Sequence, residues 1–246
     1  MSNIAHLAAQ SARQIQQAQA VVTHNLANSG TTGFKADLYQ AQSSYVDGGA
    51  VNGSAVAGSV GGGVDYSSGA IAQTGRDLDI AITGEGWFQV VADDGTLALS
   101  RRGDLRVGTD GLLKDATGKT IMGNGGPVSL PPYSSLSIGT DGTISIVPMG
   151  ELPTNIVALD RLMLVNPPPE ALVKSADGMI RVANMDGLEP DANVRVAVGA
   201  LETSNVSPVG AMVEMITLAR SFEQHIQTIK SAEELDASSA SIMKLE

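Results

Sequence analysis

The sequence predicts an α+β protein in which N- and C-terminal helices pair as a coiled coil and an antiparallel β-domain is inserted between them. Three observations support this prediction. Apolar residues at both ends of the chain recur at alternating steps of three and four, which is the spacing of a coiled-coil seam. Short apolar runs in the middle are separated by Asp-Gly pairs, a strong hairpin signal. A glycine-rich stretch separates the first helix from these runs.

The first expected segment, residues 1–34, is a helix from about residue 3 to residue 28 followed by a turn. Its seam consists of Ile4, Ala8, Ser11, Ile15, Ala18, Val22 and Asn25. Several of these side chains are small, which would let another helix approach closely. The helix ends in NLANSGTTGFK, residues 25–35. One glycine is enough to stop a helix, so the two asparagines, two glycines and one phenylalanine of this stretch need a further explanation.

A glycine-rich extended arm is expected over residues 35–75. Within it, residues 48–75 contain nine Gly and no Lys or Arg. Such a stretch buries too little apolar surface to offset the entropy lost when it becomes ordered. The arm is therefore either a flexible linker or a segment that becomes ordered against neighbouring subunits.

An antiparallel β-domain is expected over residues 76–200. Its strands are the apolar runs LDIAI, WFQVVA, LALS, DLRV, SLSI and TISIV. In SLSIGTDGTISI the alternation places Leu136 and Ile138 on one face, and an Asp-Gly turn lets Ile144 and Ile146 join them. The middle of the chain is therefore predicted to be one domain of short hairpins.

The last segment, residues 201–246, is expected to be a long helix beginning at Pro208, with Ser207 or Asn205 as its cap. Its seam consists of Met212, Met215, Ala219, Phe222, Ile226, Ile229, Glu233, Asp236, Ala240 and Met243. Each terminal seam could pack on the core of its own domain, or the helices could pair with each other and with neighbouring subunits. We favour pairing, because the seams lie at opposite ends of the chain and neither has an aromatic-rich core nearby.

The net charge of −11 is unevenly distributed. Residues 1–36 carry +2, whereas residues 201–246 hold seven acids and three bases and carry −4. The negative excess disfavours nucleic acid and anionic membranes as partners. No apolar run approaches the roughly 20 residues needed to span a bilayer. The N-terminus lacks the pattern of an ordinary signal peptide, so export would use another route.

The sequence offers no catalytic motif. His6, His24 and His225 lie in the expected helices without metal-binding spacing, and with no Cys the chain has no disulfide, thiol nucleophile or Cys-based zinc site. GLLKDATGKT lacks the spacing of a phosphate loop, and there is no GxSxG elbow. Asp77 and Asp79 would share a strand face, where surface acids are a better interpretation than a catalytic pair. We therefore predict no enzyme activity, no cofactor and no metal.

Both ends and the middle of the chain resemble the axial rod and hook proteins of the bacterial flagellum. NLANSGTTGFK is similar to the N-terminal signature of that family, and GALETSNVSPVGAMVEMITLARSFE, residues 199–223, to its C-terminal signature. LDIAITGEGWFQV followed by SRRGDLRVGTDGLL resembles the central β-domain of rod and hook subunits. The resemblance is greatest to proximal-rod members, because the arm is shorter than distal-rod or hook subunits would suggest. Thr32, His24 and Gly210 depart from the family pattern, which more often has Pro, Asn and Glu there.

The resemblance implies a structural subunit. Its terminal helices would pair and line the inner tube of the rod, with the β-domain outside. Subunits would stack helically and transmit torque from the motor to the hook. The implied partners are copies of the chain itself, other rod proteins and the flagellar type III export apparatus. The implied location is the periplasmic rod of the basal body.

The resemblance also suggests what NLANSGTTGFK does, since a tube subunit must leave the helix layer and pass outward. Asn25 and Asn28 would bond backbone groups freed at the helix end. Gly30 and Gly33 would permit a sharp exit.

Beyond this turn, Phe34 would anchor the outgoing chain in an apolar slot, and Lys35 would meet an acid of a neighbouring subunit. The residues expected at the assembly interface are Ile4, Ala8, Ile15, Val22, Asn25, Asn28, Phe34, Lys35, Asn205, Met212, Met215, Phe222, Ile226 and Ile229. Two alternatives remain: a distal-rod or hook subunit of the same family, and a secreted carbohydrate-binding or carbohydrate-active β-domain with helical tails.

Overall fold

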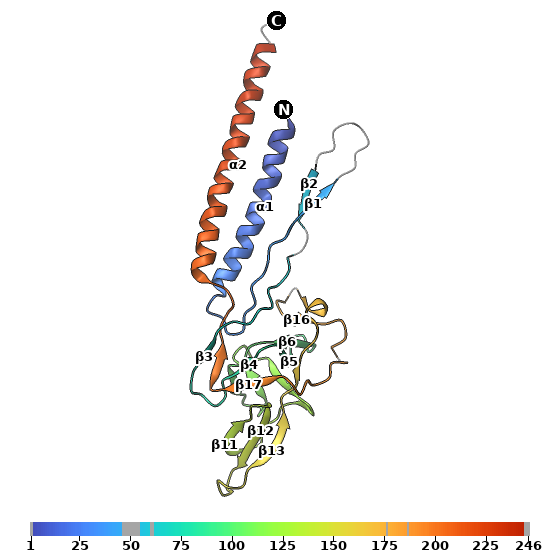
Figure 1. Cartoon of the computed structure of the whole chain (residues 1–246), viewed down its shortest axis with the longest axis vertical. Helices are drawn as coiled ribbons and strands as arrows, with labels where there is room; N and C mark the ends of the chain where they lie inside the picture. The colour runs from blue at the N-terminus through green and yellow to red at the C-terminus, as the bar shows by residue number, and fades with distance from the viewer. Residues whose placement is uncertain (1, 46–54, 60–61, 176, 186, 244–246) are drawn as a thin grey trace. The chain divides into compact units, whose positions relative to one another are not determined.

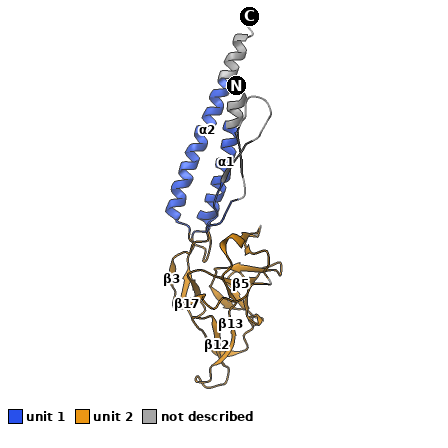
Figure 2. Cartoon of the chain, turned by 45° about the vertical axis from the view of Figure 1, so that its right-hand side comes forward, with its two compact units in different colours: residues 1–29, 36–65, 206–246 blue, residues 30–35, 66–205 orange. Residues whose placement is uncertain are grey.

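The computed structural model describes residues 2–45, 55–59, 62–175, 177–185 and 187–243 (Figure 1). They form two compact units, which Figure 2 colours separately. Unit 1 comprises residues 1–29, 36–65 and 206–246, and unit 2 comprises residues 30–35 and 66–205. The chain therefore passes between the units four times, and two of these crossings flank the last residues of NLANSGTTGFK.

Unit 1 is built on the two terminal helices. Helices α1 (Ser2–Ala27) and α2 (Pro208–Met243) lie side by side in both views. Strands β1 (Ala41–Tyr45) and β2 (Ala55–Ser59) form an antiparallel hairpin, and β2 contacts α1. No helix in the described part of the chain is both long and apolar enough to cross a bilayer.

The glycine-rich arm is divided between the two units. Part of it forms the β1–β2 hairpin of unit 1, and residues 66–75 belong to unit 2. Residues 46–54 and 60–61 of the arm lie outside the described residues. The arm thus contains regular structure that its composition did not predict, because the pairing comes from backbone hydrogen bonds rather than from an apolar pattern.

The start of α2 follows the sequence prediction. Pro208 is its first residue, and the Ser207 hydroxyl caps the helix by accepting a hydrogen bond from the Gly210 N–H at 3.3 Å. Asn205, the other candidate cap, instead donates its side-chain amide to the Ser67 carbonyl at 3.2 Å. Of the two candidates, Ser207 is therefore the cap.

Unit 2 consists of antiparallel sheets formed by short strands. The largest has nine strands, in the order β15-β16-β6-β5-β9-β8-β7, with β10 paired to β9 and β14 to β5. Its strands are β5 (Trp87–Val91), β6 (Leu97–Ser100), β7 (Leu105–Val107), β8 (Leu113–Asp115), β9 (Thr120–Gly123), β10 (Gly126–Pro127), β14 (Leu164–Val165), β15 (Val173–Lys174) and β16 (Ile180–Arg181). A 3-10 helix, η1 (Pro169–Ala171), precedes β15.

Three smaller sheets complete unit 2. One has the order β11-β12-β13, and the other two are the pairs β17-β4 and β18-β3. Their strands are β3 (Ile71–Gln73), β4 (Ile80–Thr83), β11 (Tyr133–Ile138), β12 (Thr143–Pro148), β13 (Val157–Arg161), β17 (Arg195–Val198) and β18 (Ala200–Glu202). Because β17 and β18 return to pair with β4 and β3, the two ends of the β-rich segment are joined.

The core of unit 2 comes from the expected apolar runs. Its main cluster is formed by Ile80, Ile82, Phe88, Val90, Leu105, Leu113, Ile121, Ile144, Leu162, Leu164 and neighbouring residues. The hairpin predicted in SLSIGTDGTISI is confirmed, with Leu136 opposite Ile146 and Ile138 opposite Ile144. The surface position expected for Asp79 is wrong: it is 5% exposed and lies 2.7 Å from an Arg76 guanidinium nitrogen.

The turn between β15 and β16 has a pH dependence that can be tested. Arg181 donates to both carboxylate oxygens of Asp177, at 2.8 and 2.7 Å, and to Asp94 at 3.3 Å. The hydrogen bond from Arg181 is the main cause that lowers the pKa of Asp177. The stabilisation is therefore present above the unfolded-state pKa and is lost as the pH falls through the lowered folded-state pKa. A carbon NMR titration of the Asp177 carboxyl should show a midpoint below the ordinary value of about 3.9.

Arg181→Gln should move this midpoint upward, because the hydrogen bonds to the carboxylate are lost. The control is Arg106→Gln, at an exposed position on β7. An unchanged midpoint in Arg181→Gln would mean that the ion pair does not form in solution.

Candidate functional site

The end of NLANSGTTGFK is fixed in unit 2 by a buried ionic cluster. The Lys35 ammonium lies 2.7 Å from Glu202 Oε1, and Arg101 Nη1 lies 2.9 Å from Glu202 Oε2. The side chains of all three residues are at most 3% exposed. Charges so deeply buried are tolerated only when they are paired and hydrogen-bonded. Residues 35, 101 and 202 therefore hold three distant parts of the sequence in one arrangement.

Backbone groups add hydrogen bonds to this cluster, although the buried Arg101 Nε has no hydrogen-bond partner among the described residues. Lys35 also donates to the Ser67 carbonyl at 2.7 Å, and Glu202 Oε1 accepts from the Gly69 N–H at 2.9 Å. Arg101 donates its other terminal nitrogen to the Gly84 carbonyl at 2.8 Å. The Glu202 carboxylate thus accepts from two cations and one backbone N–H, so it is the shared partner of both buried positive charges.

This arrangement corrects the partner expected for Lys35. We expected an acid of a neighbouring subunit, but the ammonium is buried on Glu202 of the same chain. The expectation was wrong because Glu202 lies 167 residues away in the sequence and its pairing depends on β18 returning to β3. Phe34 is half-buried, and the Lys174 ammonium lies 5.3 Å from its ring centroid, so its anchoring in an apolar slot stays a prediction.

The two glycines of the exit turn have different roles. Gly33 has a φ of +66°, and a Cβ built on it would lie 2.5 Å from the Arg101 carbonyl carbon. Its N–H donates to the Glu202 carbonyl at 2.8 Å. Gly30 does not have a positive φ, and a Cβ there would meet nothing within 4 Å. Only Gly33 therefore requires the absence of a side chain.

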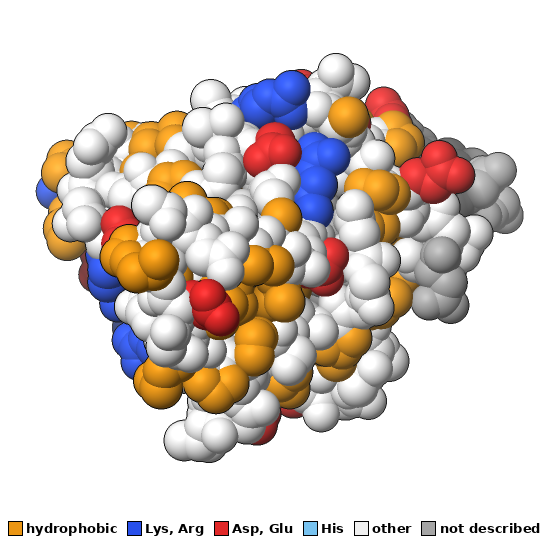
Figure 3. Space-filling view, turned by 90° about the horizontal axis from the view of Figure 1, so that it is seen from below, with side chains coloured by type: hydrophobic (Ala, Val, Ile, Leu, Met, Phe, Trp, Pro, Cys, Tyr) orange, Lys and Arg blue, Asp and Glu red, His pale blue; other side chains and the backbone are white. Residues whose placement is uncertain are grey.

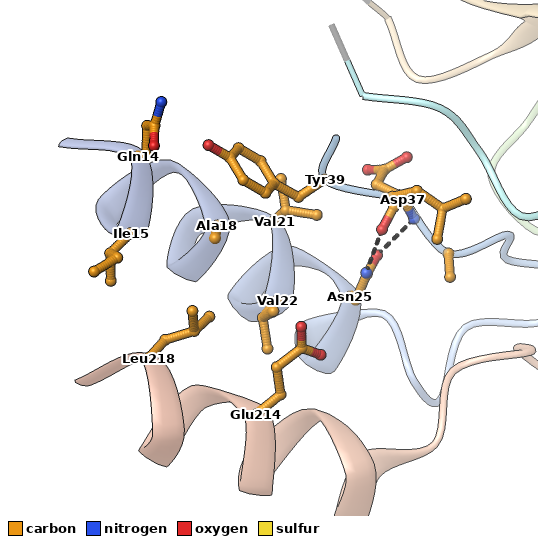
Figure 4. Close-up of a pocket in the computed structure, with 12 residues that line it drawn as sticks. Gln14, Ile15, Ala18, Val21, Val22, Asn25, Asp37, Tyr39, Glu214 and Leu218 are labelled. Carbon is orange, nitrogen blue, oxygen red and sulfur yellow. Dashed lines mark hydrogen bonds between the residues drawn. The ribbon is translucent and has the colours of Figure 1, made fainter. Parts of the chain in front are cut away.

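Asn25 joins the outgoing chain to α1. Its amide nitrogen donates to the Asp37 carbonyl at 2.8 Å, and its amide oxygen accepts from the Asp37 N–H at 2.8 Å (Figure 4). His24 Nδ1 lies 2.8 Å from the Asp37 carboxylate. Asn28 has the expected local role, because its side chain donates to the His24 carbonyl at 3.0 Å. The Asn25 side chain thus pairs with both backbone groups of Asp37, as a neighbouring strand would. The Asn28 side chain provides a donor for a carbonyl at the end of the helix.

A groove of about 500 Å³ lies between α1, α2 and the chain that leaves the exit turn (Figure 4). We call it the α1–α2 groove. It is lined by Gln14, Ile15, Ala18, Val21, Val22, Asn25, Ala36, Asp37, Leu38, Tyr39, Glu214 and Leu218. Most of these side chains are apolar, and the two charged ones, Asp37 and Glu214, are both acids.

The helix positions expected at an interface differ in their exposure. Ala8 and Val22 of α1 are buried, and Ile15 is half-buried, as are Met215, Phe222, Ile226 and Ile229 of α2. The side chain of Ile4 lies outside the described residues. Met212 is 52% exposed in the single chain, whereas its neighbour Ala211 is buried. The small Ala211 takes the covered position at the start of α2, so Met212 is turned away.

The outer face of α2 carries an apolar surface that we call the α2 stripe: Val209, Met212, Val213 and Ile216. These residues are 72%, 52%, 59% and 55% exposed. Unit 2 also has exposed apolar residues at and before β13, including Met149, Leu152 and Ile156. Figure 3, which views the molecule from below, shows apolar side chains in orange among polar ones. Exposed apolar patches of this kind commonly mark contacts with other molecules.

Sequence reasoning missed Glu202 and Arg101, whose only signals were an acid in GALETSN and the pair RR before Gly103. Neither segment has an apolar period that would mark these residues as buried. The sequence analysis expected Lys35 to pair with an acid. Identifying Glu202 as that acid requires knowing that β18 pairs with β3.

Comparison with known proteins gives matches along most of the chain. Residues 6–35 match the model of flagella basal body rod proteins, and residues 81–146 match that of the flagellar hook protein FlgE/F/G D1 domain. Residues 197–242 match the C-terminal model of flagellar basal body rod FlgEFG proteins. Two residues of the buried cluster lie within these matched ranges: Lys35 in the first and Glu202 in the last.

Three relatives show how far the similarity extends. The flagellar basal-body rod protein FlgF of Salmonella typhimurium is 35% identical over 240 residues, covering 95% of each chain. FlgF of Escherichia coli is 32% identical over 240 residues, again covering 95% of each chain. The flagellar basal-body rod protein FlgG of Bacillus subtilis is 29% identical over 238 residues, covering 87% of this chain and 89% of its own.

Proposed function

Because the chain belongs to the FlgF family of flagellar basal-body rod proteins, in which it is a structural rod subunit, we propose that it builds the proximal rod and transmits motor torque to the hook. Subunits assemble helically with copies of the chain and with other rod proteins. Torque passes through many repeated contacts rather than through a chemical step, so the protein is not an enzyme. The carbohydrate-binding alternative is set aside, because the family match covers nearly the whole chain.

The observation that carries this proposal is the arrangement of unit 1. Two helices from opposite ends of the chain lie side by side, and α2 still exposes the α2 stripe. The proposal is that α1 and α2 pair as a coiled coil in the inner tube, with residues 1–34 and 201–246 as the tube segments. Residues 76–200 form the outer β-domain, and residues 35–75 form an arm between them.

Unit 2 explains how such a subunit could carry load. The chain that leaves α1 is fixed to unit 2 by the buried cluster of Lys35, Glu202 and Arg101. Glu202 lies only six residues before Pro208, where α2 begins. The chains that enter and leave the helices are therefore tied together by the same carboxylate, which would resist their separation under torque.

The same family membership supports a proposal for export and location. The subunit is proposed to leave the cytoplasm through the flagellar type III apparatus and to assemble in the periplasm. The alternative of a distal-rod or hook subunit predicts a different position in purified basal bodies, which labelling of the β-domain in electron micrographs would distinguish.

The proposal is tested by charging the half-buried face of α2. Phe222→Asp places a carboxylate where α2 is covered, so incorporation into rods and swimming motility should both be lost, while unit 2 should remain folded. The matched control is Thr228→Asp, at an exposed position of the same helix, which should swim normally. Motility is measured in soft agar, incorporation in purified basal bodies, and unit 2 folding by the fluorescence of Trp87. Normal motility of Phe222→Asp would contradict the proposal.

A further inference from the structure

Unit 1 has two uncovered surfaces of complementary character. The first is the α2 stripe, whose residues recur at i, i+3, i+4 and i+7 and so lie on one side of the helix. Arg220 follows Ile216 by four residues and extends the same side. It is exposed, and within the described part of the chain it forms no salt bridge. The stripe is therefore an apolar surface that ends in an available positive charge.

The second surface is the α1–α2 groove, which has the opposite charge. Its side chains are mainly apolar, and its two charged residues are acids. Asp37 is already held by His24 and Asn25, but Glu214 is exposed and has no partner among the described residues. Figure 4 shows Glu214 and Leu218 both projecting from α2 toward α1. The groove therefore offers an apolar site with one available negative charge.

The two surfaces also match in length. The stripe with its terminal arginine runs from Val209 to Arg220, and the α1 wall of the groove runs from Gln14 to Asn25. At 1.5 Å per residue, each extends about 16 Å along its helix. Each successive residue of α2 is rotated by about 100° around the helix axis. Glu214 and Leu218 therefore lie roughly on the opposite side of α2 from the stripe. One copy can therefore offer both surfaces at once.

We propose that the α2 stripe of one copy of this chain docks in the α1–α2 groove of the next, with Arg220 against Glu214. This inference rests on the proposed rod function and names the contact that joins one subunit to its neighbour. Burial of the stripe supplies the driving force, whereas the charge pair sets the register. Because the partners use different surfaces, the contact does not close as a symmetric dimer but continues from copy to copy, as a helical assembly requires.

Cysteine crosslinking tests the contact directly, since the chain contains no native Cys. Purified full-length Val213→Cys, on the stripe, is mixed with Val21→Cys, in the groove, and oxidised with copper phenanthroline. The mixture should give a disulfide-linked dimer at roughly tenfold the yield of either variant alone. The control for the stripe is Thr228→Cys, on exposed α2 surface outside it, which should not crosslink to Val21→Cys.

Two results would overturn the docking. Efficient crosslinking of Val213→Cys with itself would show that stripes pack against each other in a symmetric dimer. Equal, low yields from the mixture and from the Thr228→Cys control would show that the stripe does not enter the groove.

Swapping the charges of Arg220 and Glu214 provides a second test, which does not depend on crosslinking. Arg220→Glu and Glu214→Arg should each lower incorporation into basal bodies by roughly fivefold, and the double variant should recover it, because the pair is restored in reverse. Both positions are exposed, so the subunit should fold in each case. If Phe222→Asp blocks incorporation but the exchange changes nothing, the rod function stands and this docking is wrong. If neither has an effect, the rod function itself fails.

Discussion

Glu202→Ala should lower the free energy of unfolding of unit 2 by about 3–5 kcal/mol, the usual cost of leaving buried charges without their partner. The substitution removes the carboxylate that accepts from Lys35 at 2.7 Å and from Arg101 at 2.9 Å. Both cations would remain inside unit 2, because their side chains are at most 3% exposed. Urea unfolding can be followed by fluorescence of Trp87, the only tryptophan, whose ring lies 5.2 Å from the Arg101 guanidinium carbon.

The control for this variant is Glu189→Ala, which removes an exposed carboxylate from the same unit. Its free energy of unfolding should change by no more than about 0.5 kcal/mol. Equal stabilities of the two variants would contradict the buried cluster. A triple replacement of Lys35, Arg101 and Glu202 by apolar residues should recover part of the loss, since no unpaired charge would then be buried.

Gly33→Ala should destabilise unit 2 by about 2–4 kcal/mol, from the left-handed backbone conformation and the crowding together. The φ of Gly33 is +66°, and its added methyl group would lie 2.5 Å from the Arg101 carbonyl carbon. Relief of that contact would move residue 33 away from Arg101, and so would disturb the hydrogen bond from the Gly33 N–H to the Glu202 carbonyl. The same urea titration measures the effect.

Gly30→Ala provides a matched control three residues earlier in the same turn. Its backbone does not have a positive φ, and no atom lies within 4 Å of the added methyl group. We expect no loss, or a gain of up to about 1 kcal/mol from the stiffer unfolded chain. Losses of similar size at both positions would mean that the exit turn needs general flexibility rather than one close backbone approach.

Local patterns in the sequence predicted the elements of the fold well. The spacing of apolar residues identified α1 and α2, because a helix repeats its covered face at a fixed interval. Asp-Gly pairs located hairpins such as β11–β12, because few other residues adopt that turn. The cap was narrowed to two residues, and the structure selects Ser207. In the arm, where glycine removes any apolar pattern, the β1–β2 hairpin was not predicted.

The roles of individual residues in the exit turn were less predictable. Its composition showed that more than a helix end was involved. Asn25 bonds the outgoing chain at Asp37, and Gly33 and Lys35 contact Glu202 in a distant segment. The sequence could not separate Gly33 from Gly30, since both are glycines in the same turn. What separates them is the Arg101 backbone beside one and open space beside the other.

The sequence by itself determined the family, the two terminal helices and the hairpin-rich middle, because each depends on residues that are neighbours along the chain. Only the tertiary structure decided that Lys35 pairs with Glu202, 167 residues away, and that Met212 faces outward while Ala211 is covered. The physical reason is the same in both cases. Which partner a buried charge meets, and which side of a helix is covered, depend on the packing of distant segments that no local pattern records.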